Sequence, residues 1–201
     1  MTLLQSSRGG AALAVVAALL YIHEEDYYLD AVVDAPLGAV YELLSSPQNI
    51  TAIHPKLSSS RILSQERHAA GALLEWELQT SAIWAAPFPF SLLQGLTSME
   101  RVSTVAMRQG DERARITNTG LAGYRGKLVP FYYYHWWDLT AVPGEPGRTA
   151  VREYELLKGC YLKFLLGAMD ATQRTHKAMQ ANLIVWAKAW APPSQQQSQE
   201  R

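Results

Sequence analysis

The strongest periodic signal in this 201-residue chain lies near its C-terminal end, from about Cys160 to Trp190. Apolar and small residues recur there at steps of three and four, the spacing of one face of an α-helix. The sequence therefore predicts a helix of roughly 30 residues, which Pro192-Pro193 ends. The predicted stripe consists of Tyr161, Leu165, Ala168, Thr172, His176, Met179, Leu183, Trp186 and Trp190.

A strand and two short helices are predicted at the start of the folded part. The segment Tyr27–Val33 is rich in Tyr and Val, which favours a strand. Pro36 is a good first helical residue, and apolar residues spaced three and four apart continue that helix to about Ser45. Pro47 predicts a second short helix, which ends at His54-Pro55.

The middle of the chain has no convincing long amphipathic helix and is predicted to form strands. Runs rich in β-branched and aromatic residues alternate with turn signals, as in an antiparallel meander. The segment Ala86–Gly95 is apolar and interrupted by prolines, so it predicts a flap near a cavity mouth. The predicted strands are Ser58–Gln65, Ala72–Thr80, Ser98–Arg108, Ala114–Asn118, Lys127–Val142 and Thr149–Leu156.

Length and charge exclude several classes of protein. The chain is long enough for one domain and too short for two with a linker. Eighteen basic residues balance eighteen acidic ones without a Lys/Arg cluster, so no nucleic-acid partner is expected. The single cysteine, Cys160, excludes an internal disulfide, and no His/Cys grouping has metal-ligand spacing. We therefore expect neither a metal site nor another cofactor.

An apolar run at residues 11–22 precedes the domain. It is shorter than the roughly 18 to 20 residues that cross a bilayer, but it fits a signal peptide or a marginal membrane anchor. The alternative is an apolar helix packed on the domain. We divide the chain into a leader at 1–25, a globular domain at 26–191 and a disordered polar tail at 192–201. Membrane association or secretion is expected, otherwise a cytoplasmic location, and a sequon at Asn49 would suit glycosylation in a lumenal domain.

The stretch FYYYHWW, residues 131–137, concentrates aromatic side chains around one histidine. A membrane-interface belt needs a spanning element beside it, whereas this stretch adjoins strands and turns, so we interpret it as a strand. The pattern leaves open which of its faces points inward. An inward aromatic face suits a mostly hydrophobic ligand with a few oxygens. The two faces carry Tyr132, Tyr134 and Trp136 on one side and Phe131, Tyr133, His135 and Trp137 on the other.

No motif for a nucleophilic triad, a phosphate-binding loop or a zinc site appears in the sequence. Candidate catalytic groups are therefore polar residues on apolar faces. His135 is the first candidate for a general acid or base, because imidazole exchanges protons near neutral pH. His176 lies on the apolar stripe and would face His135 from the opposite wall, with the hydroxyl of Tyr133 as a third candidate. The alternative for each histidine is a packed side chain with its hydrogen bonds satisfied.

Other residues are candidates for ligand contacts, with core packing as the alternative. Glu153 and Glu155 share a strand face with Val151, and we expect both glutamates on an ordinary solvated face. The candidate ligand contacts are His54, Trp76, Met107, Phe131, Trp137, Tyr154 and Met179.

The predicted element order is that of the helix-grip fold, and one segment adds a second likeness. Residues 33–55, VDAPLGAVYELLSSPQNITAIHP, resemble the opening of START-like proteins at Ala35-Pro36, Val40-Tyr41, Ser46-Pro47 and His54-Pro55. This superfamily includes polyketide cyclases and dehydrases, the coenzyme Q chaperone of mitochondria, plant hormone receptors and the birch pollen allergen. The resemblance implies an α+β fold in which a curved antiparallel sheet grips the long helix around a hydrophobic cavity, with His54 near the ligand entrance.

Such a fold does not transfer a reaction, because members of the superfamily bind, carry, sense or cyclise their ligands. Our leading hypothesis is a polyketide cyclase-like enzyme that assists ring closure or dehydration of a hydrophobic small molecule, with positioning supplying much of the rate. The rival hypothesis is a non-catalytic carrier or sensor of a lipid or isoprenoid. A third hypothesis is a membrane-anchored interaction protein whose aromatic run contacts a partner.

Overall fold

One antiparallel sheet and three helices make up the described part of the protein, which is seen here as a computed structural model. The structure describes residues 22–68, 71–80, 96–105, 110–124, 128–160 and 168–190. The helices are α2 (Leu37–Ser45), α3 (Pro47–Ile50) and α5 (Ala168–Ala189). The strands are β1 (Ile22–Val33), β2 (Leu57–His68), β3 (Gly71–Thr80), β4 (Leu96–Val105), β5 (Arg113–Tyr124), β6 (Leu128–Val142) and β7 (Glu145–Cys160).

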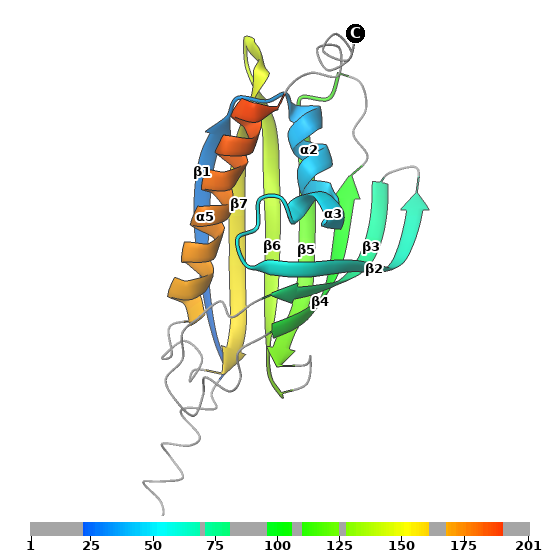
Figure 1. The fold of residues 1–201 in the computed structure, drawn as a ribbon, viewed down its shortest axis with the longest axis vertical. Helices are drawn as coiled ribbons and strands as arrows, with labels where there is room; N and C mark the ends of the chain where they lie inside the picture. Colours follow the sequence, from blue (N-terminus) through cyan, green and yellow to red (C-terminus); the bar gives the residue numbers. More distant parts are fainter. Residues whose placement is uncertain are drawn as a thin grey trace, which may run out of the picture.

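The strands form a single sheet in the order β1-β7-β6-β5-β4-β3-β2, with every neighbouring pair antiparallel. The chain therefore runs as a meander from β2 to β7, and β1 completes the sheet beside β7. Figure 1 shows that the sheet twists strongly, so that β2 crosses the direction of β6, while α5 runs along β1 and β7. The predicted α+β helix-grip architecture is confirmed.

Prolines mark the starts of the two short helices: Pro47 begins α3 as predicted, whereas α2 begins one residue after Pro36, which was predicted to be its first residue. Pro36 precedes the first residue of α2 in an extended conformation, and Pro47 occupies the first turn of α3. Proline suits these places because its missing N–H would have no partner inside the helix. The side chains that α2 buries, Leu37, Val40, Leu43 and Leu44, follow the predicted three-four spacing.

Several strands are longer than the sequence predicts. β1 begins at Ile22, so the acidic residues 23–26 belong to the strand and the predicted boundary at Tyr27 is wrong. β5 continues past Asn118 to Tyr124, and β7 extends to Cys160. Each extension pairs with a neighbouring strand along its length, and this pairing holds residues of weak strand propensity in place.

The C-terminal helix is shorter than predicted in its described part. Cys160 is the last residue of β7, so the helix does not begin there, and α5 is described from Ala168. Residues 161–167 lie outside the described residues, as do the predicted flap at 86–95, the tail at 192–201 and the leader up to residue 21.

The hairpin between β6 and β7 closes over two residues, Pro143 and Gly144. Val142 pairs with Glu145 across this turn, and Gly144 has a φ of 76°. A turn of this kind takes proline at its second position and glycine at its third, because only glycine adopts positive φ without steric cost. The tight turn lets β7 begin at Glu145, four residues earlier than predicted.

The hydrophobic core lies between the inner face of the sheet and the helices. Because successive strand residues point to opposite faces, the odd-numbered positions of β6 and β7 face this core. The structure thus decides which face of the aromatic stretch points inward, since Trp137 and Leu139 are buried there. The core contains Val33, Leu37, Val40, Leu43, Leu44, Ile53, Val102, Ile116, Trp137, Leu139, Val151, Met179, Leu183 and Ala187.

The even-numbered aromatic residues form a stack on the outer face. Tyr154 stacks on Trp136 with ring centroids 3.8 Å apart, and Tyr28 packs on Tyr154 at 4.7 Å. The guanidinium of Arg115 lies over the Trp136 ring, 5.6 Å from its centroid. The aromatic stretch is therefore divided between an outer stack and an inner wall.

Gly120 of β5 makes room for the ring of Tyr133 on the neighbouring strand. The two residues are paired across β5 and β6, and a Cβ at position 120 would lie 2.3 Å from the tyrosine ring. No side chain larger than hydrogen fits there without displacing the ring.

We predict that Gly120→Ala destabilises the protein by about 1–3 kcal/mol, because the added methyl group overpacks against Tyr133. Urea unfolding at neutral pH measures the change. Gly38→Ala in α2 is the matched control, since nothing lies within 4 Å of its added Cβ. The control is expected to be neutral or stabilising by up to about 1 kcal/mol. Equal stability of both variants would contradict the steric argument.

Candidate functional site

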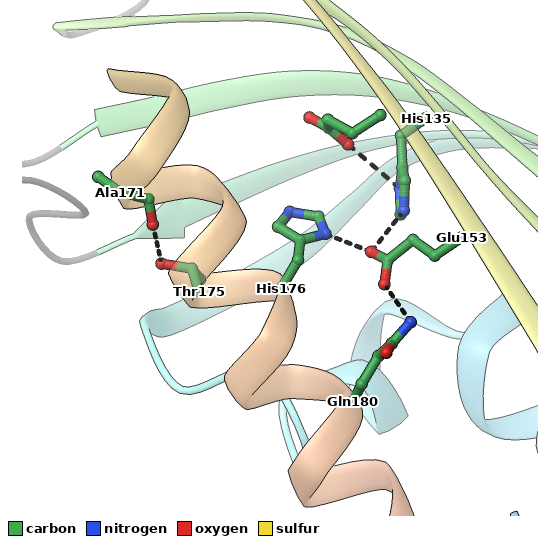
Figure 2. A network of polar contacts seen from close by, with 7 residues as sticks. His135, Glu153, Ala171, Thr175, His176 and Gln180 are labelled. Atoms are coloured by element: carbon green, nitrogen blue, oxygen red, sulfur yellow. Dashed lines mark hydrogen bonds and ion pairs between the residues drawn. The ribbon is translucent and has the colours of Figure 1, made fainter. Parts of the chain in front are cut away.

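Polar side chains interrupt the buried inner face where β6, β7 and α5 meet. His135 of β6 is 4% exposed, and Glu153 and Glu155 of β7 are 0% and 3% exposed. His176 and Gln180 approach them from α5, as Figure 2 shows. Charged side chains are almost never fully buried without partners. We call these five residues the buried polar cluster.

Glu153 is the centre of this cluster. His135 Nε2 donates to Glu153 Oε1 at 2.9 Å, and His176 Nδ1 contacts the same oxygen. Gln180 Nε2 donates to the other oxygen, Oε2, at 3.1 Å (Figure 2). One carboxylate therefore joins an imidazole of the sheet to an imidazole and an amide of the helix.

The local structure explains why these side chains converge. Glu153 and Glu155 are two residues apart on β7 and so point to the same face as Val151 and Leu157. His176 and Gln180 are four residues apart on α5, which places them on successive turns of one helix face. Packing α5 against the sheet then brings the two pairs together.

The cluster continues as a row across the sheet. Tyr27 of β1 pairs with Glu155, Glu155 pairs with His135, and His135 pairs with Asn118 of β5. Tyr27 and Asn118 are 8% and 3% exposed. Within the described part of the chain, the Tyr27 hydroxyl and Asn118 Oδ1 are buried without a hydrogen-bond partner. Such orphaned groups are rare in folded proteins.

Burial and mutual contacts shift the pKa values of the cluster. Burial acts to raise the pKa of Glu153, but His176 and His135 outweigh it and hold this pKa at about 2. Burial lowers the pKa of His135 although Glu153 opposes that change. Burial and the charges of Glu155 and Glu153 raise the pKa of Tyr27, so its hydroxyl keeps its proton. Glu153 is therefore a carboxylate at neutral pH.

His54 lies close enough to the cluster to be affected by its charges. Burial lowers the pKa of His54 to about 4, and the imidazoles of His176 and His135 act in the same direction. Its Nδ1 accepts a hydrogen bond from the backbone N–H of Lys56 at 3.2 Å. His54 is thus neutral at physiological pH.

The structure brings the predicted catalytic residues onto one inner surface. His135 and His176 have ring centroids 5.1 Å apart, and Trp137 packs edge-on against His135 at 4.0 Å. Tyr133 is on the same face of β6, above Gly120. Met179 lies three residues after His176 on α5 and is buried in the core.

Other predicted ligand contacts lie elsewhere. Tyr154 belongs to the outer aromatic stack, so the sheet separates it from the buried polar cluster. Trp76 and Phe131 belong to β3 and β6, but their side chains lie outside what the structure describes. Met107 lies outside the described residues altogether.

The prediction that Glu153 and Glu155 lie on a solvated face is wrong, because both are buried. Sequence reasoning also missed Gln180, Tyr27 and Asn118. The sequence contained one signal for the two glutamates. On β7 they occupy the same alternate positions as the apolar residues Val151 and Leu157, and so lie on the same face of the strand. This pattern could not show that the glutamates are buried, because the sequence did not reveal which face of the sheet points inward.

Two features bear on the cellular location of the protein, a sequon and the character of its helices, and neither involves the buried polar cluster. Asn49 is exposed on α3, where its amide donates to the carbonyl of Glu42 at 3.4 Å, and its glycosylation stays a prediction. Among the helices that the structure describes, none has the length and apolar character to span a bilayer.

We predict that acid destabilises the fold through His54. Its pKa falls from the ordinary value of 6.5 to about 4 on folding, so between these values the unfolded chain binds more protons than the folded one. The free energy of unfolding should therefore decrease as pH falls from 6.5 to 4, by up to about 3 kcal/mol from this residue. Urea unfolding across this range measures the decrease.

His54→Gln removes that titration and provides the comparison. The difference in stability between wild type and variant should change across the same pH window and level off outside it. A difference that is independent of pH would contradict the assignment to His54.

Comparisons with known proteins place this arrangement in a recognised fold. No protein-family model and no curated protein matches the sequence. Among solved structures, the Zhui aromatase/cyclase from Streptomyces sp. R1128 is similar with a TM-score of 0.58 and 12% identity, over 86% of this chain and 98% of that chain. A hypothetical protein from Helicobacter pylori has a TM-score of 0.52 and 12% identity, over 84% of this chain and 88% of that chain.

A START superfamily protein from Mycobacterium smegmatis is also similar, with a TM-score of 0.51 and 11% identity, over 82% of this chain and 97% of that chain. Such low identities speak to the fold alone. The sheet order, the position of α5 and these three likenesses agree with one another. This chain therefore has the helix-grip fold that these solved structures share.

Proposed function

We propose that this protein binds a hydrophobic, oxygen-bearing small molecule against the inner face of the sheet and assists its ring closure or dehydration. The observation that carries the proposal is the contact of His135 and His176, from opposite walls, with the same buried carboxylate, that of Glu153. The similarity in fold to an aromatase/cyclase supports the same class of reaction.

Proton transfer is the chemistry that this geometry serves best. Closing a ring on a poly-β-ketone chain removes one proton from a carbon and adds one to an oxygen. Loss of water then moves another proton from a carbon to the departing hydroxyl group. A base and an acid are sufficient for both steps, and imidazole performs either role.

The proposal gives separate roles to the carboxylate, to the proton-transfer groups and to the apolar side chains. Glu153 holds both imidazoles in orientation, so that His135 acts as the base and His176 or the Tyr133 hydroxyl acts as the acid. Trp137, Met179 and His54 contact the apolar body of the ligand. Positioning the chain for attack supplies a large part of the rate, which is why few catalytic side chains are needed.

We expect His135→Gln and His176→Gln each to lower turnover by about 10²–10⁴-fold, the usual contribution of a general acid or base. Conversion of a linear poly-β-ketone analogue to its cyclic product, followed by mass spectrometry, measures the rate against a reaction without protein. His23→Gln is the matched control, because His23 lies on β1 and bonds Glu25, which is not a member of the cluster. Turnover that is the same in all variants, or no faster than without protein, would sink the catalytic proposal.

A carrier without catalysis is the second candidate, and the saturation of Glu153 favours it. Both of its oxygens already have partners, so the network also serves as a purely structural link between sheet and helix. A carrier needs only the apolar inner face and a few polar groups to orient its ligand.

Native mass spectrometry of the freshly purified chain separates the two candidates. A carrier is expected to hold one intact hydrophobic molecule per chain, and its occupancy should survive His135→Gln. An enzyme is expected to release a changed product and to bind an unreacted analogue transiently. Recovery of the analogue unchanged after long incubation, with unit occupancy, would favour the carrier over the enzyme.

A further inference from the structure

The buried polar cluster contains three residues of the kinds that bind transition metals. His135, Glu155 and His176 each offer one ligand atom, and these atoms all lie within 4.8 Å of one another. The residues come from β6, β7 and α5, so they surround one point from the sheet and from the helix. The sequence led us to expect no metal site because the three positions are far apart in the chain.

The orientation of His135 suits a metal ligand. Its Nε2 donates to the buried carboxylate of Glu153, while its Nδ1 faces Glu155 Oε2 at 4.0 Å. Histidines that bind metals almost always donate their other ring N–H to a carboxylate, a carbonyl or a water, which fixes the tautomer and the ring plane. Glu153 provides that support for His135 and also contacts His176.

The neighbouring orphaned groups point to a ligand in the same place. The Tyr27 hydroxyl and Asn118 Oδ1, at the two ends of the row through Glu155 and His135, have no partner among the described residues. Both side chains are more than nine-tenths buried. Waters held by a metal ion would satisfy a buried acceptor and a buried hydroxyl of this kind.

The charges of the cluster also favour a divalent cation. Glu153 and Glu155 are both carboxyl groups taken out of water, and a buried carboxylate is costly unless opposite charge compensates it. One divalent ion balances both. Hard cations such as Mg²⁺ prefer oxygen ligands, whereas two imidazoles with one carboxylate suit Zn²⁺ and related ions.

We propose that His135, Glu155 and His176 bind a divalent transition-metal ion of the zinc class, with Glu153 as the outer carboxylate that holds the imidazoles. Bonds of about 2.1 Å in a tetrahedral site place ligand atoms about 3.4 Å apart, so the three side chains close by little more than 1 Å on binding. The fourth position of the tetrahedral ion is left for a water. This site goes beyond the proposed function. In any one molecule the two states are alternatives, since an imidazole nitrogen that binds the ion cannot at the same time exchange a proton with a substrate.

The test uses the full-length chain without a polyhistidine tag, stripped of metal by a chelator. Titration with Co²⁺ is expected to produce visible absorption that saturates at one ion per chain. Added Zn²⁺ should displace the Co²⁺ and raise the melting temperature, whereas Mg²⁺ should do neither. Absence of the absorption and of the shift in melting temperature would overturn the proposal.

Substitutions locate the ion. Three ligand variants are tested: Glu155→Gln, which keeps the size of the side chain, His135→Gln and His176→Gln. Loss of an outer partner of a metal ligand weakens metal binding by about 10–100-fold, and each of these variants should weaken Co²⁺ binding by more than that. His23→Gln should bind as the wild type does, and far-UV circular dichroism establishes that each variant is folded. Binding that is unchanged in the three ligand variants would place the ion elsewhere and overturn the proposal. These measurements contain no substrate, so their failure and a failure of ring closure are distinguishable.

Discussion

The burial of the Glu153 carboxylate is the constraint on which the inner face of this protein depends. Removing an ionised carboxylate from water costs several kcal/mol unless hydrogen bonds and opposite charges compensate it. The compensation comes from His135 on the sheet and from His176 and Gln180 on the helix. These contacts are directional, whereas the apolar contacts of Met179 and Leu183 are not. The polar contacts therefore set the position of α5 on the sheet.

Strand alternation gives the two faces of the sheet different roles. The outer face of β6 and β7 holds the stack of Trp136 and Tyr154 beside Arg115. The inner face holds His135 and the two glutamates within a border of apolar side chains. A low-dielectric border strengthens every polar contact inside it and makes every unpaired group costly. The inner face is consequently where the proposed function has its chemistry.

The order and the kinds of elements were predictable from the sequence because they follow local patterns. Proline at positions 36 and 47 starts the short helices, and the three-four spacing around Met179 and Leu183 identifies the C-terminal helix. Boundaries were less predictable. β5 and β7 extend through weak strand formers such as Gly120 and Gly159 because neighbouring strands supply their hydrogen bonds. Such pairing is not visible in a local window of sequence.

The sequence by itself determined the fold class and identified His135 and His176 as polar interruptions of apolar patterns. Only the tertiary structure decided that Glu153 and Glu155 are buried, because alternation divides a strand into two faces without saying which one is covered. The tertiary structure also decided that Tyr154 faces outward and that positions 135, 155 and 176 converge. That convergence arises when the helix packs across the strands, and side chains distant in the chain acquire their common environment only in that packing.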